Sequence, residues 1–412
     1  MLEHVKRFDT ARPAQRQHLG WLIRLLSIPA LLRHRNRLRK IGMEGIKAPY
    51  FLLCNHNAFM DFMVASKAVW PARANFIVAI DGFLKREWLL RFIGCICTRK
   101  FTVDLPLVKN MLRAAKAGDV VALYPEARYS LCGTTAVIPD SVGKLAKKMC
   151  VPVVVLLCHG HHINSPFWNL RDRGVKGTEA EMRCILTPEE LRSLPLAEIN
   201  RRIREALVYD EYAWQKKRGV RVTAPWRAEG LHKVLYQCPH CGREYRMRTA
   251  GAKLSCAACG SEWEMTELGE LRCLTGKTRF SHIPDWYEWE RENVRQEVEN
   301  GRYAFSCTAH VDALPKDRFI PLGKARLTHD LTGFTLETER EGIVHIPAQS
   351  QYSCHIEYEY LGKYGDCVDL NTPTDTLYIY PDGCGFSVTK LALATEELYA
   401  WHHRQPKERS AL

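Results

Sequence analysis

Short apolar runs alternate with stretches of helical spacing between residues 46 and 160. A short uninterrupted apolar run indicates a buried strand, whereas apolar residues three or four positions apart indicate a helix. The predicted strands span residues 49–54, 75–80, 94–98, 120–124 and 151–157, and the predicted helices span 59–69, 107–117 and 141–149. Near-continuous apolar strands separated by helices are typical of a sheet covered on both faces. Residues 46–225 are therefore predicted to form an α/β domain with a mixed sheet covered by helices.

A longer helical segment closes this predicted domain. Residues 187–216 have helical spacing, with Thr187 as the N-cap and Glu189 and Glu190 in the first turn. The threonine side chain can accept a hydrogen bond from a free backbone N–H, and acidic residues stabilise the positive end of the helix dipole. We expect this segment to pack on the sheet and to end the domain near residue 220.

The pattern changes in the C-terminal half. A linker helix is predicted for residues 284–301, where Trp286 and Trp289 are expected to pack between domains. Residues 303–390 break into short alternating segments separated by turn signals, and roughly seven strands fit. A helix with Thr395 as its N-cap is predicted for residues 395–403. Seven strands and one closing helix suggest a mainly-β, pleckstrin-homology-like barrel over residues 302–405.

Residues 1–45 combine an apolar segment with a basic one. The apolar part, residues 21–32, is too short to span a bilayer and is interrupted by a charge and a proline. Residues 1–50 hold 11 Lys/Arg against 3 Asp/Glu, and much of this charge follows the apolar part directly. Basic residues beside apolar ones are typical of a segment that lies in the interface of an anionic membrane. The alternative is an N-terminal helix packed on the protein's own core.

The charge of the chain bears on its partners and location. A formal net charge of +13 requires an anionic partner. Lipid headgroups are favoured, and a nucleic-acid partner is not expected, because the basic residues lie beside the apolar segment. Neither a transmembrane helix nor a signal peptide is expected, since the apolar part is short and precedes its charges. We expect a peripheral, monotopic protein on the cytoplasmic face of a membrane.

Four of the sixteen cysteines form two matched pairs. Two residues separate Cys238 from Cys241 and Cys256 from Cys259, and a glycine follows each pair. Four thiolates at this spacing predict a zinc ribbon over residues 230–275, and because sulfur fills all four positions the Zn²⁺ is expected to be structural. A redox-active pair is the alternative, although it does not account for two matched pairs. The other cysteines stand singly, as in proteins of the reducing cytosol.

The first candidate for chemistry follows the predicted strand 49–54. Asn55 and His56 leave this strand, and Asp61 lies near the start of the next helix. The carboxylate can reach back to one imidazole nitrogen and fix the tautomer, which leaves the other nitrogen basic. Such a pair is suited to removing a proton from a hydroxyl nucleophile.

A second motif follows the predicted strand 120–124 and reads Tyr124-Pro125-Glu126-Ala127-Arg128-Tyr129-Ser130. Together the two motifs resemble those of the PlsC-like glycerolipid acyltransferases, whose blocks read Asn-His-x4-Asp and Phe-Pro-Glu-Gly-Thr-Arg-Ser. Residues 94–100 and 151–155 resemble the second and fourth blocks, so the resemblance covers roughly residues 40–165. The third block departs from the family, because Gly-Thr-Arg has become Ala-Arg-Tyr.

The resemblance implies an O-acyltransferase that moves a fatty acyl group from acyl-CoA or acyl carrier protein to a lysophosphatidate-like acceptor. His56 is then the general base, and Asp61 stabilises the imidazolium. The implied substrate contacts come from Asn55, Glu126, Arg128 and either Arg99 or Lys100. A loop-organising role is the alternative for Glu126, and an ion pair is the alternative for Arg128.

Two further interpretations stay open. The chain is alternatively a lipid-binding or scaffold protein whose altered third block has lost catalysis, or an acyltransferase for a different lysolipid. Residues 158–162, Cys-His-Gly-His-His, follow the fourth-block strand. We expect them to line the acceptor pocket or to be structural rather than to bind a metal, since no partner ligand stands in a suitable register.

Overall fold

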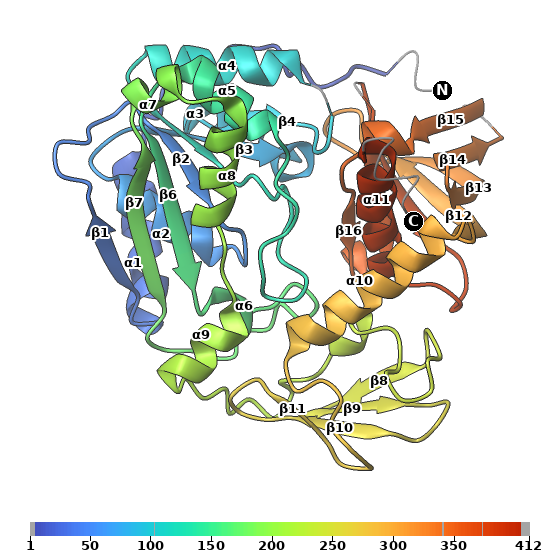
Figure 1. The fold of residues 1–412 in the computed structure, drawn as a ribbon. Coiled ribbons are helices and arrows are strands. Elements are labelled where there is room, and N and C mark those ends of the chain that lie inside the picture. Colours follow the sequence, from blue (N-terminus) through green and yellow to red (C-terminus); the bar gives the residue numbers. More distant parts are fainter. Residues whose placement is uncertain (1–4, 103, 340–341, 373, 405–412) are drawn as a thin grey trace.

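The chain folds into three sheets that follow one another along the sequence (Figure 1). The computed structural model describes residues 5–102, 104–339, 342–372 and 374–404. The first sheet has seven strands in the order β1-β7-β6-β2-β5-β3-β4. Its neighbouring strands are parallel except β6 and β7, which are antiparallel. The predicted mixed sheet is confirmed.

The elements of this first unit are bounded as follows. The strands are β1 (Arg37–Ile41), β2 (Phe51–Cys54), β3 (Ala74–Ala79), β4 (Ile96–Thr98), β5 (Val120–Leu123), β6 (Val153–His159) and β7 (Glu179–Leu186). The helices are α1 (Gly20–Arg33), α2 (Met60–Val69), α3 (Glu87–Phe92), α4 (Leu105–Lys116), α5 (Ser141–Met149), α6 (His161–Asn164), α7 (Pro188–Ser193), α8 (Leu196–Ala206) and α9 (Glu211–Arg218).

Alternate residues of the central strand β2 face opposite layers. Leu52 and Cys54 lie in one apolar cluster with Val64 of α2, whereas Phe51 and Leu53 lie in another with residues of α4, α5 and α8. All four strand residues are fully buried. Successive side chains of a strand point to opposite faces, so a wholly apolar strand fits a sheet covered on both sides.

Two strands have no counterpart in the predicted pattern. β1 and β7 pair with each other in parallel, and neither has a continuous apolar run. β1 lies within residues 1–45, so the sheet includes part of the segment that the sequence pattern separates from it. Within the described residues, no helix combines the length and the apolar character that a membrane crossing requires.

The predicted helical stretch over 187–216 is three helices rather than one. α7 begins where the sequence predicts, because the side chain of Thr187 accepts from the backbone of Glu190 and the Glu190 side chain accepts from the backbone of Thr187. Pro195 then precedes α8, and Asp210 caps α9 by accepting from Ala213 N–H. The last helix places Glu211 beside the end of β6, which matters for the site described below.

The second sheet is small and antiparallel and has the order β11-β10-β9-β8. Trp263 of β10 is fully buried and packs edge-on against Trp286 of α10, with ring centroids 5.1 Å apart. Its strands are β8 (Met247–Ala250), β9 (Lys253–Cys256), β10 (Glu262–Met265) and β11 (Leu271–Cys273), and the helix that follows is α10 (Ile283–Glu299).

The third sheet has seven antiparallel strands in the order β15-β14-β13-β12-β18-β17-β16. β15 and β16 are its two edges and are not paired with each other in the part of the chain that the structure describes, so a closed pleckstrin-homology-like barrel is not confirmed. The strands are β12 (Ala304–Ala313), β13 (Ile320–Asp330), β14 (Gly333–Thr338), β15 (Gly342–Pro347), β16 (His355–Glu357), β17 (Cys367–Asn371) and β18 (Thr376–Pro381).

The C-terminal helix α11 (Val388–His403) begins earlier than predicted. Thr395 is not its N-cap but lies in its middle, where the buried hydroxyl donates to the Leu391 carbonyl oxygen at 2.8 Å. The prediction was wrong because a threonine inside a helix can bond to the preceding turn, so its hydroxyl does not mark a helix start. The apolar residues before Thr395 are buried and extend the helix by two turns.

Candidate active site

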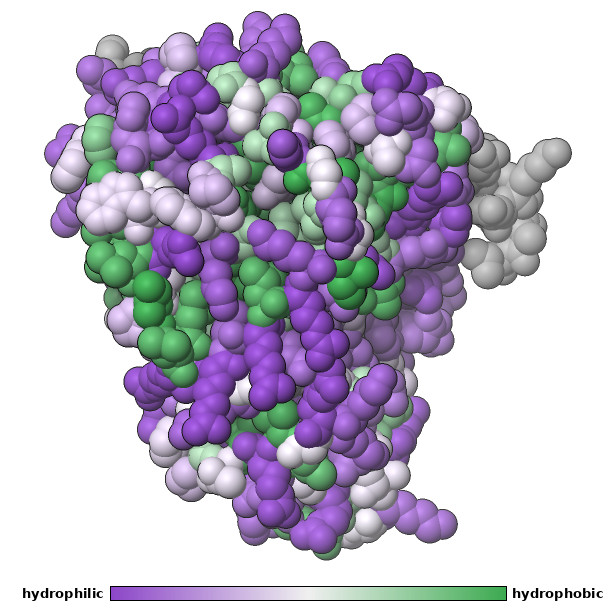
Figure 2. Space-filling view, turned by 90° about the vertical axis from the view of Figure 1, so that its left-hand side faces the viewer, coloured by the Kyte–Doolittle hydropathy of each residue, from purple (hydrophilic) through white to green (hydrophobic). Residues whose placement is uncertain are grey.

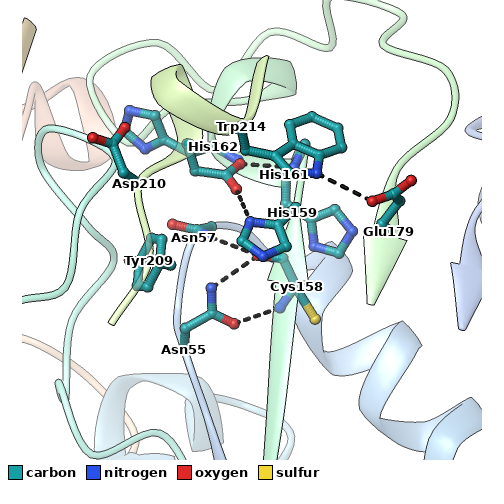
Figure 3. Close-up of polar contacts among 12 residues, drawn as sticks. Asn55, Asn57, Cys158, His159, His161, His162, Glu179, Tyr209, Asp210 and Trp214 are labelled. Carbon is teal, nitrogen blue, oxygen red and sulfur yellow. Dashed lines mark hydrogen bonds and ion pairs between the residues drawn. The ribbon is translucent and has the colours of Figure 1, made fainter. Parts of the chain in front are cut away.

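The end of β2 is fixed to β6 through an amide side chain. Asn55 Nδ2 donates to the Cys158 carbonyl oxygen at 2.9 Å, and its Oδ1 accepts from Cys158 N–H at 2.8 Å. Figure 3 shows these bonds and the Asn57 amide, which donates to the same carbonyl at 3.4 Å. Asn55 is fully buried with both amide atoms engaged. Asn55 therefore fixes the start of the loop that carries His56 to β6.

His56 and Asp61 lie within reach of each other. His56 Nδ1 is 3.4 Å from Asp61 Oδ2, and Asp61 stands in the first turn of α2. The same Oδ2 accepts from the backbone N–H of Asn57 at 2.5 Å and of Ala58 at 2.9 Å. Because Nδ1 faces the carboxylate, Nε2 is the nitrogen left for a reacting group.

Asp61 also contacts a histidine of the 158–162 segment. Its Oδ1 accepts from His161 Nδ1 at 2.5 Å, and both side chains are fully buried. Burial opposes ionisation of Asp61, but the hydrogen bonds from His161 and His56 prevail and lower its pKa to about 2. Burial likewise lowers the pKa of His56, against the opposing effect of the bond to Asp61. The structure therefore holds an ionised carboxylate beside a neutral imidazole at neutral pH.

Two aromatic rings enclose His56. The Tyr124 ring is stacked on it with centroids 4.1 Å apart, and the Tyr129 ring lies 4.3 Å away. The His56 side chain nevertheless keeps 21% of its surface exposed, while Asp61 has none. The imidazole is thus the part of the pair that a substrate can reach.

The second motif is bonded directly to the first. Ser130 N–H donates to the His56 carbonyl oxygen at 2.8 Å, and His56 N–H donates to Glu126 Oε1 at 3.4 Å. Glu126 Oε2 accepts from Ala136 N–H at 3.0 Å, and the side chain is 1% exposed. Burial raises the pKa of Glu126 to about 8, although both backbone bonds act against this. These contacts agree with the loop-organising alternative for Glu126.

Arg128 does not face the imidazole. Its Nη2 donates to Glu396 Oε1 of α11 at 2.6 Å, and the two side chains are 3% and 2% exposed. A buried arginine that already has a carboxylate partner is not available to a substrate phosphate without breaking that pair. Arg128 thus forms an ion pair between the first unit and the C-terminal helix, as in the alternative given for it above.

Of the two alternative basic positions, Arg99 is also engaged. It is buried, and its Nη2 donates to the carbonyl oxygens of Thr374 at 2.6 Å and Pro315 at 3.4 Å. Lys100 is only partly buried, and its positive charge lowers the pKa of His56, as does that of His355 of β16. The same charge acts to lower the pKa of Asp369 on β17, so Lys100 acts on a carboxylate of the third sheet as well as on the imidazole.

Comparison with known proteins identifies the first unit. Residues 31–158 match the family model described as Acyltransferase. This segment is an acyltransferase-family domain. A crystal structure of the 1-acyl-sn-glycerophosphate (LPA) acyltransferase PlsC from Thermotoga maritima is 18% identical over 46% of this chain and 76% of its own, with a TM-score of 0.37. At that score the likeness bears on no further point, and among curated proteins none matches the sequence.

After the first unit in the sequence, the four paired cysteines come together as predicted. Their Sγ atoms all lie within 4.8 Å of one another, with Cys238 and Cys259 3.7 Å apart and Cys241 and Cys256 3.8 Å apart. A tetrahedral zinc with Zn–S bonds of about 2.3 Å separates its sulfurs by roughly 3.8 Å. The set therefore fits a four-coordinate metal, and sulfur occupies every ligand position.

Three residues without an expected role contribute to the candidate site. His161 bonds to Asp61, Glu211 accepts from the Gly160 and His162 N–H groups, and Glu396 pairs with Arg128. The histidine signal was visible in the 158–162 segment, which was expected to line a pocket or to be structural. Neither glutamate stands in a recognisable motif, because each acts on residues far away in the sequence.

Proposed function

We propose that this chain transfers a fatty acyl group from an acyl thioester, acyl-CoA or acyl carrier protein, to the hydroxyl of a lysophosphatidate-like glycerolipid. The observation that carries the proposal is the His56–Asp61 pair inside an acyltransferase-family domain. A buried, ionised carboxylate faces one nitrogen of a partly exposed imidazole, as a general base requires. General base catalysis of this kind contributes a rate factor of ~10²–10⁴.

The acyl group passes directly from the thioester to the acceptor hydroxyl, without an acyl-enzyme intermediate. His56 Nε2 takes the proton of the acceptor hydroxyl while the hydroxyl oxygen attacks the thioester carbonyl carbon. The C–S bond then breaks, the thiolate leaves with the electron pair, and the imidazolium returns its proton to the sulfur. An ester and a free thiol result, and His56 is neutral again. Asp61 stabilises the imidazolium between the two proton transfers, since opposite charges attract strongly in a buried site.

The anionic part of the acceptor is assigned to Lys100. Arg99 and Arg128 are occupied by backbone carbonyls and by Glu396, whereas Lys100 is partly exposed and its charge acts on His56. An ammonium acts on a phosphate as a point charge and does not require the bidentate geometry of arginine. Replacing Lys100 with methionine is expected to raise KM for a phosphate-bearing acceptor more than it lowers kcat.

The exposed face of α1 is the proposed contact with the membrane. Trp21, Leu25, Leu26 and Leu32 have exposed fractions between 54% and 71%. Figure 2 faces the side on which α1 and β1 lie and shows apolar side chains gathered beside hydrophilic ones. Apolar groups flanked by arginines favour an anionic lipid interface. Peripheral attachment would bring a lipid acceptor and its enzyme to the same surface.

The metal of the four-cysteine site is proposed to be zinc in a structural role. Sulfur-only tetrahedral sites are typical of Zn²⁺, and no ligand position is left for a substrate. The residues that would hold it are Cys238, Cys241, Cys256 and Cys259.

Acyl transfer from radiolabelled acyl-CoA or acyl carrier protein to a panel of lysolipids tests the proposed function. His56→Ala is expected to lose ~10²-fold or more of the activity. His345→Ala is the matched control, because His345 is an exposed histidine on β15, away from Asp61. Unchanged turnover in His56→Ala would refute the mechanism.

The second candidate is a lipid-binding protein without catalysis. It is favoured by one observation, the engagement of Arg128 with Glu396 in a third block that departs from the family. Binding of the wild type to anionic liposomes, with no transfer to any acceptor in the panel, would support this candidate over the enzyme.

A further inference from the structure

Asp61 is shared between two histidines. One oxygen, Oδ1, accepts from His161 Nδ1 at 2.5 Å, whereas Oδ2 is 3.4 Å from His56 Nδ1. The shorter bond is thus made to the histidine that no substrate can reach, since His161 has no exposed surface. Hydrogen bonds to both oxygens orient the carboxylate: His161 donates to Oδ1, and the Asn57 and Ala58 N–H groups donate to Oδ2.

The position of His161 is itself tightly determined. Gly160 has φ +88°, and a Cβ there would lie 3.0 Å from Thr178 and 3.2 Å from the Trp214 ring, so a larger residue would be strained and would press on both neighbours. Glu211 is fully buried and accepts from Gly160 N–H at 2.8 Å and His162 N–H at 3.1 Å. The turn that presents His161 is therefore fixed on both sides.

We propose that His161 is a positioning residue of the acyl transfer: its Nδ1–H holds the Asp61 carboxylate so that the second oxygen faces His56. This rests on the proposed function of the His56–Asp61 pair. The donated hydrogen bond also favours the ionised form of Asp61, which would otherwise be disfavoured by burial. An ionised and oriented Asp61 in turn favours the imidazolium that forms when His56 accepts a proton.

The same atoms suit this role better than metal binding. Asp61, His161 and Cys158 place three ligand atoms within 4.8 Å of one another, and all three residues are buried. A zinc site with three protein ligands keeps its fourth position open for water or substrate. None of these three side chains has exposed surface, so the set offers no such open position.

Three single variants and one matched control separate positioning from folding. His161→Leu removes the donor, whereas His161→Asn keeps an N–H donor close to the Nδ1 position. His162→Leu is the control, because His162 is equally buried and adjacent but its ring lies against Tyr212. His56→Ala serves as the reference for complete loss of the base.

Steady-state kinetics should distinguish these variants. His161→Leu is expected to lower kcat by about 100-fold, as small misplacements of a catalytic group do, with KM changed less than about twofold. His161→Asn should recover most of kcat, and His162→Leu should stay near the wild-type value. Equal kcat in His161→Leu and wild type would overturn the proposal. Equal losses in His161→Leu and His162→Leu would do the same, since they would indicate packing alone.

NMR titration of His56 gives a readout that does not depend on turnover. In His161→Leu the pKa of His56 is expected to fall, because Asp61 is no longer held against its imidazole, while His162→Leu leaves this pKa unchanged. An unchanged or raised His56 pKa in His161→Leu contradicts the positioning role even if the protein transfers no acyl group. If instead the pKa falls but the wild type lacks activity, the proposed function fails and the positioning of Asp61 stands.

Discussion

Glu396 joins the C-terminal helix to the loop that encloses His56, so its ion pairs give a test of how much this junction stabilises the protein. It accepts from Arg128 at 2.6 Å, from Arg291 at 2.7 Å and from Ser353 at 2.8 Å. All of its partners are more than four-fifths buried. Glu396→Gln removes the charge and keeps the size of the side chain, so any loss reports the ion pairs rather than a cavity.

The expected loss of stability depends on which carboxylate partners Arg128 and Arg291 still have when Glu396 is neutral. Arg291 keeps Glu288 at 3.2 Å and Glu397 at 3.3 Å, whereas no other carboxylate contacts Arg128 among the described residues. Removing one partner of a buried pair leaves an uncompensated charge and costs about 3–5 kcal/mol. We therefore expect Glu396→Gln to lower the free energy of unfolding by about that amount and to weaken the loop that encloses His56.

The pH dependence gives a second check. Burial raises the pKa of Glu396, but Arg128 and Arg291 prevail and hold it below its ordinary value. A folded-state pKa below the unfolded one stabilises the protein above the unfolded pKa, and this stabilisation is lost as pH falls through the folded pKa. The difference in stability between wild type and Glu396→Gln should therefore be full at neutral pH and shrink in acid.

Urea unfolding followed by tryptophan fluorescence is the assay. Glu205→Gln is the matched control, because Glu205 makes its ion pair with Arg201 on the exposed surface of α8, where a pair contributes about 0–1 kcal/mol. The double variant Arg128→Met with Glu396→Leu should recover much of the loss, since no buried charge is then left without a partner at this pair. A loss in Glu396→Gln no larger than that of the control would refute the reasoning.

Three further predictions concern the metal, the membrane and the base. Cys256→Ser is expected to release one equivalent of bound zinc per chain, measured by a colorimetric chelator, and to lower the unfolding temperature; full zinc retention would contradict the four-sulfur site. Leu26→Glu and Leu32→Glu should each weaken sedimentation with anionic liposomes by ~10-fold or more, whereas Val208→Glu, a control of similar exposure away from α1, should not. Because burial lowers the pKa of His56 from 6.5, the acid limb of kcat/KM should lie below pH 6.5, and a limb above that value would argue against His56 as the base.

The parts of the fold that could be predicted are those whose signal is local. α5 has the bounds expected from its spacing, and the N-cap at Thr187 is confirmed together with its partner Glu190. β2 and β5 are wholly apolar because each is buried on both faces of the sheet. In these elements the side chains that determine the structure stand within a few residues of one another, so the pattern alone is sufficient.

The pattern missed strands that do not need apolar side chains on both faces. β1 is an edge strand, exposed along most of its length, and its residues Arg37 to Ile41 include three basic side chains. An edge strand needs apolar residues on one face at most, and charges there also discourage pairing with other chains. The backbone of these residues pairs with β7, and their basic side chains are still proposed to face lipid headgroups.

The partners of Arg128 and Asp61 could not be predicted for a different reason. Glu396 lies 268 residues after Arg128, and His161 lies 100 residues after Asp61. The sequence marks each of these residues as polar, but only the packing of α11 and β6 decides which polar groups meet in the interior. The resemblance implies a substrate role for Arg128, while in the structure the guanidinium is paired with Glu396.

A chain of contacts links the two C-terminal units to the loop that carries Arg128. Gln237, beside Cys238 of the four-cysteine set, is bonded to α10 through Glu290 and Trp286. α10 then reaches Glu396 through Arg291, and Glu396 holds the loop that is bonded to His56. One apolar cluster also runs through all three units, from Leu131 and Phe167 to the ribbon and the C-terminal helix. The four-cysteine unit and the β-rich unit therefore share one apolar core with the loop that encloses His56, and we expect changes in that core to alter the surroundings of His56.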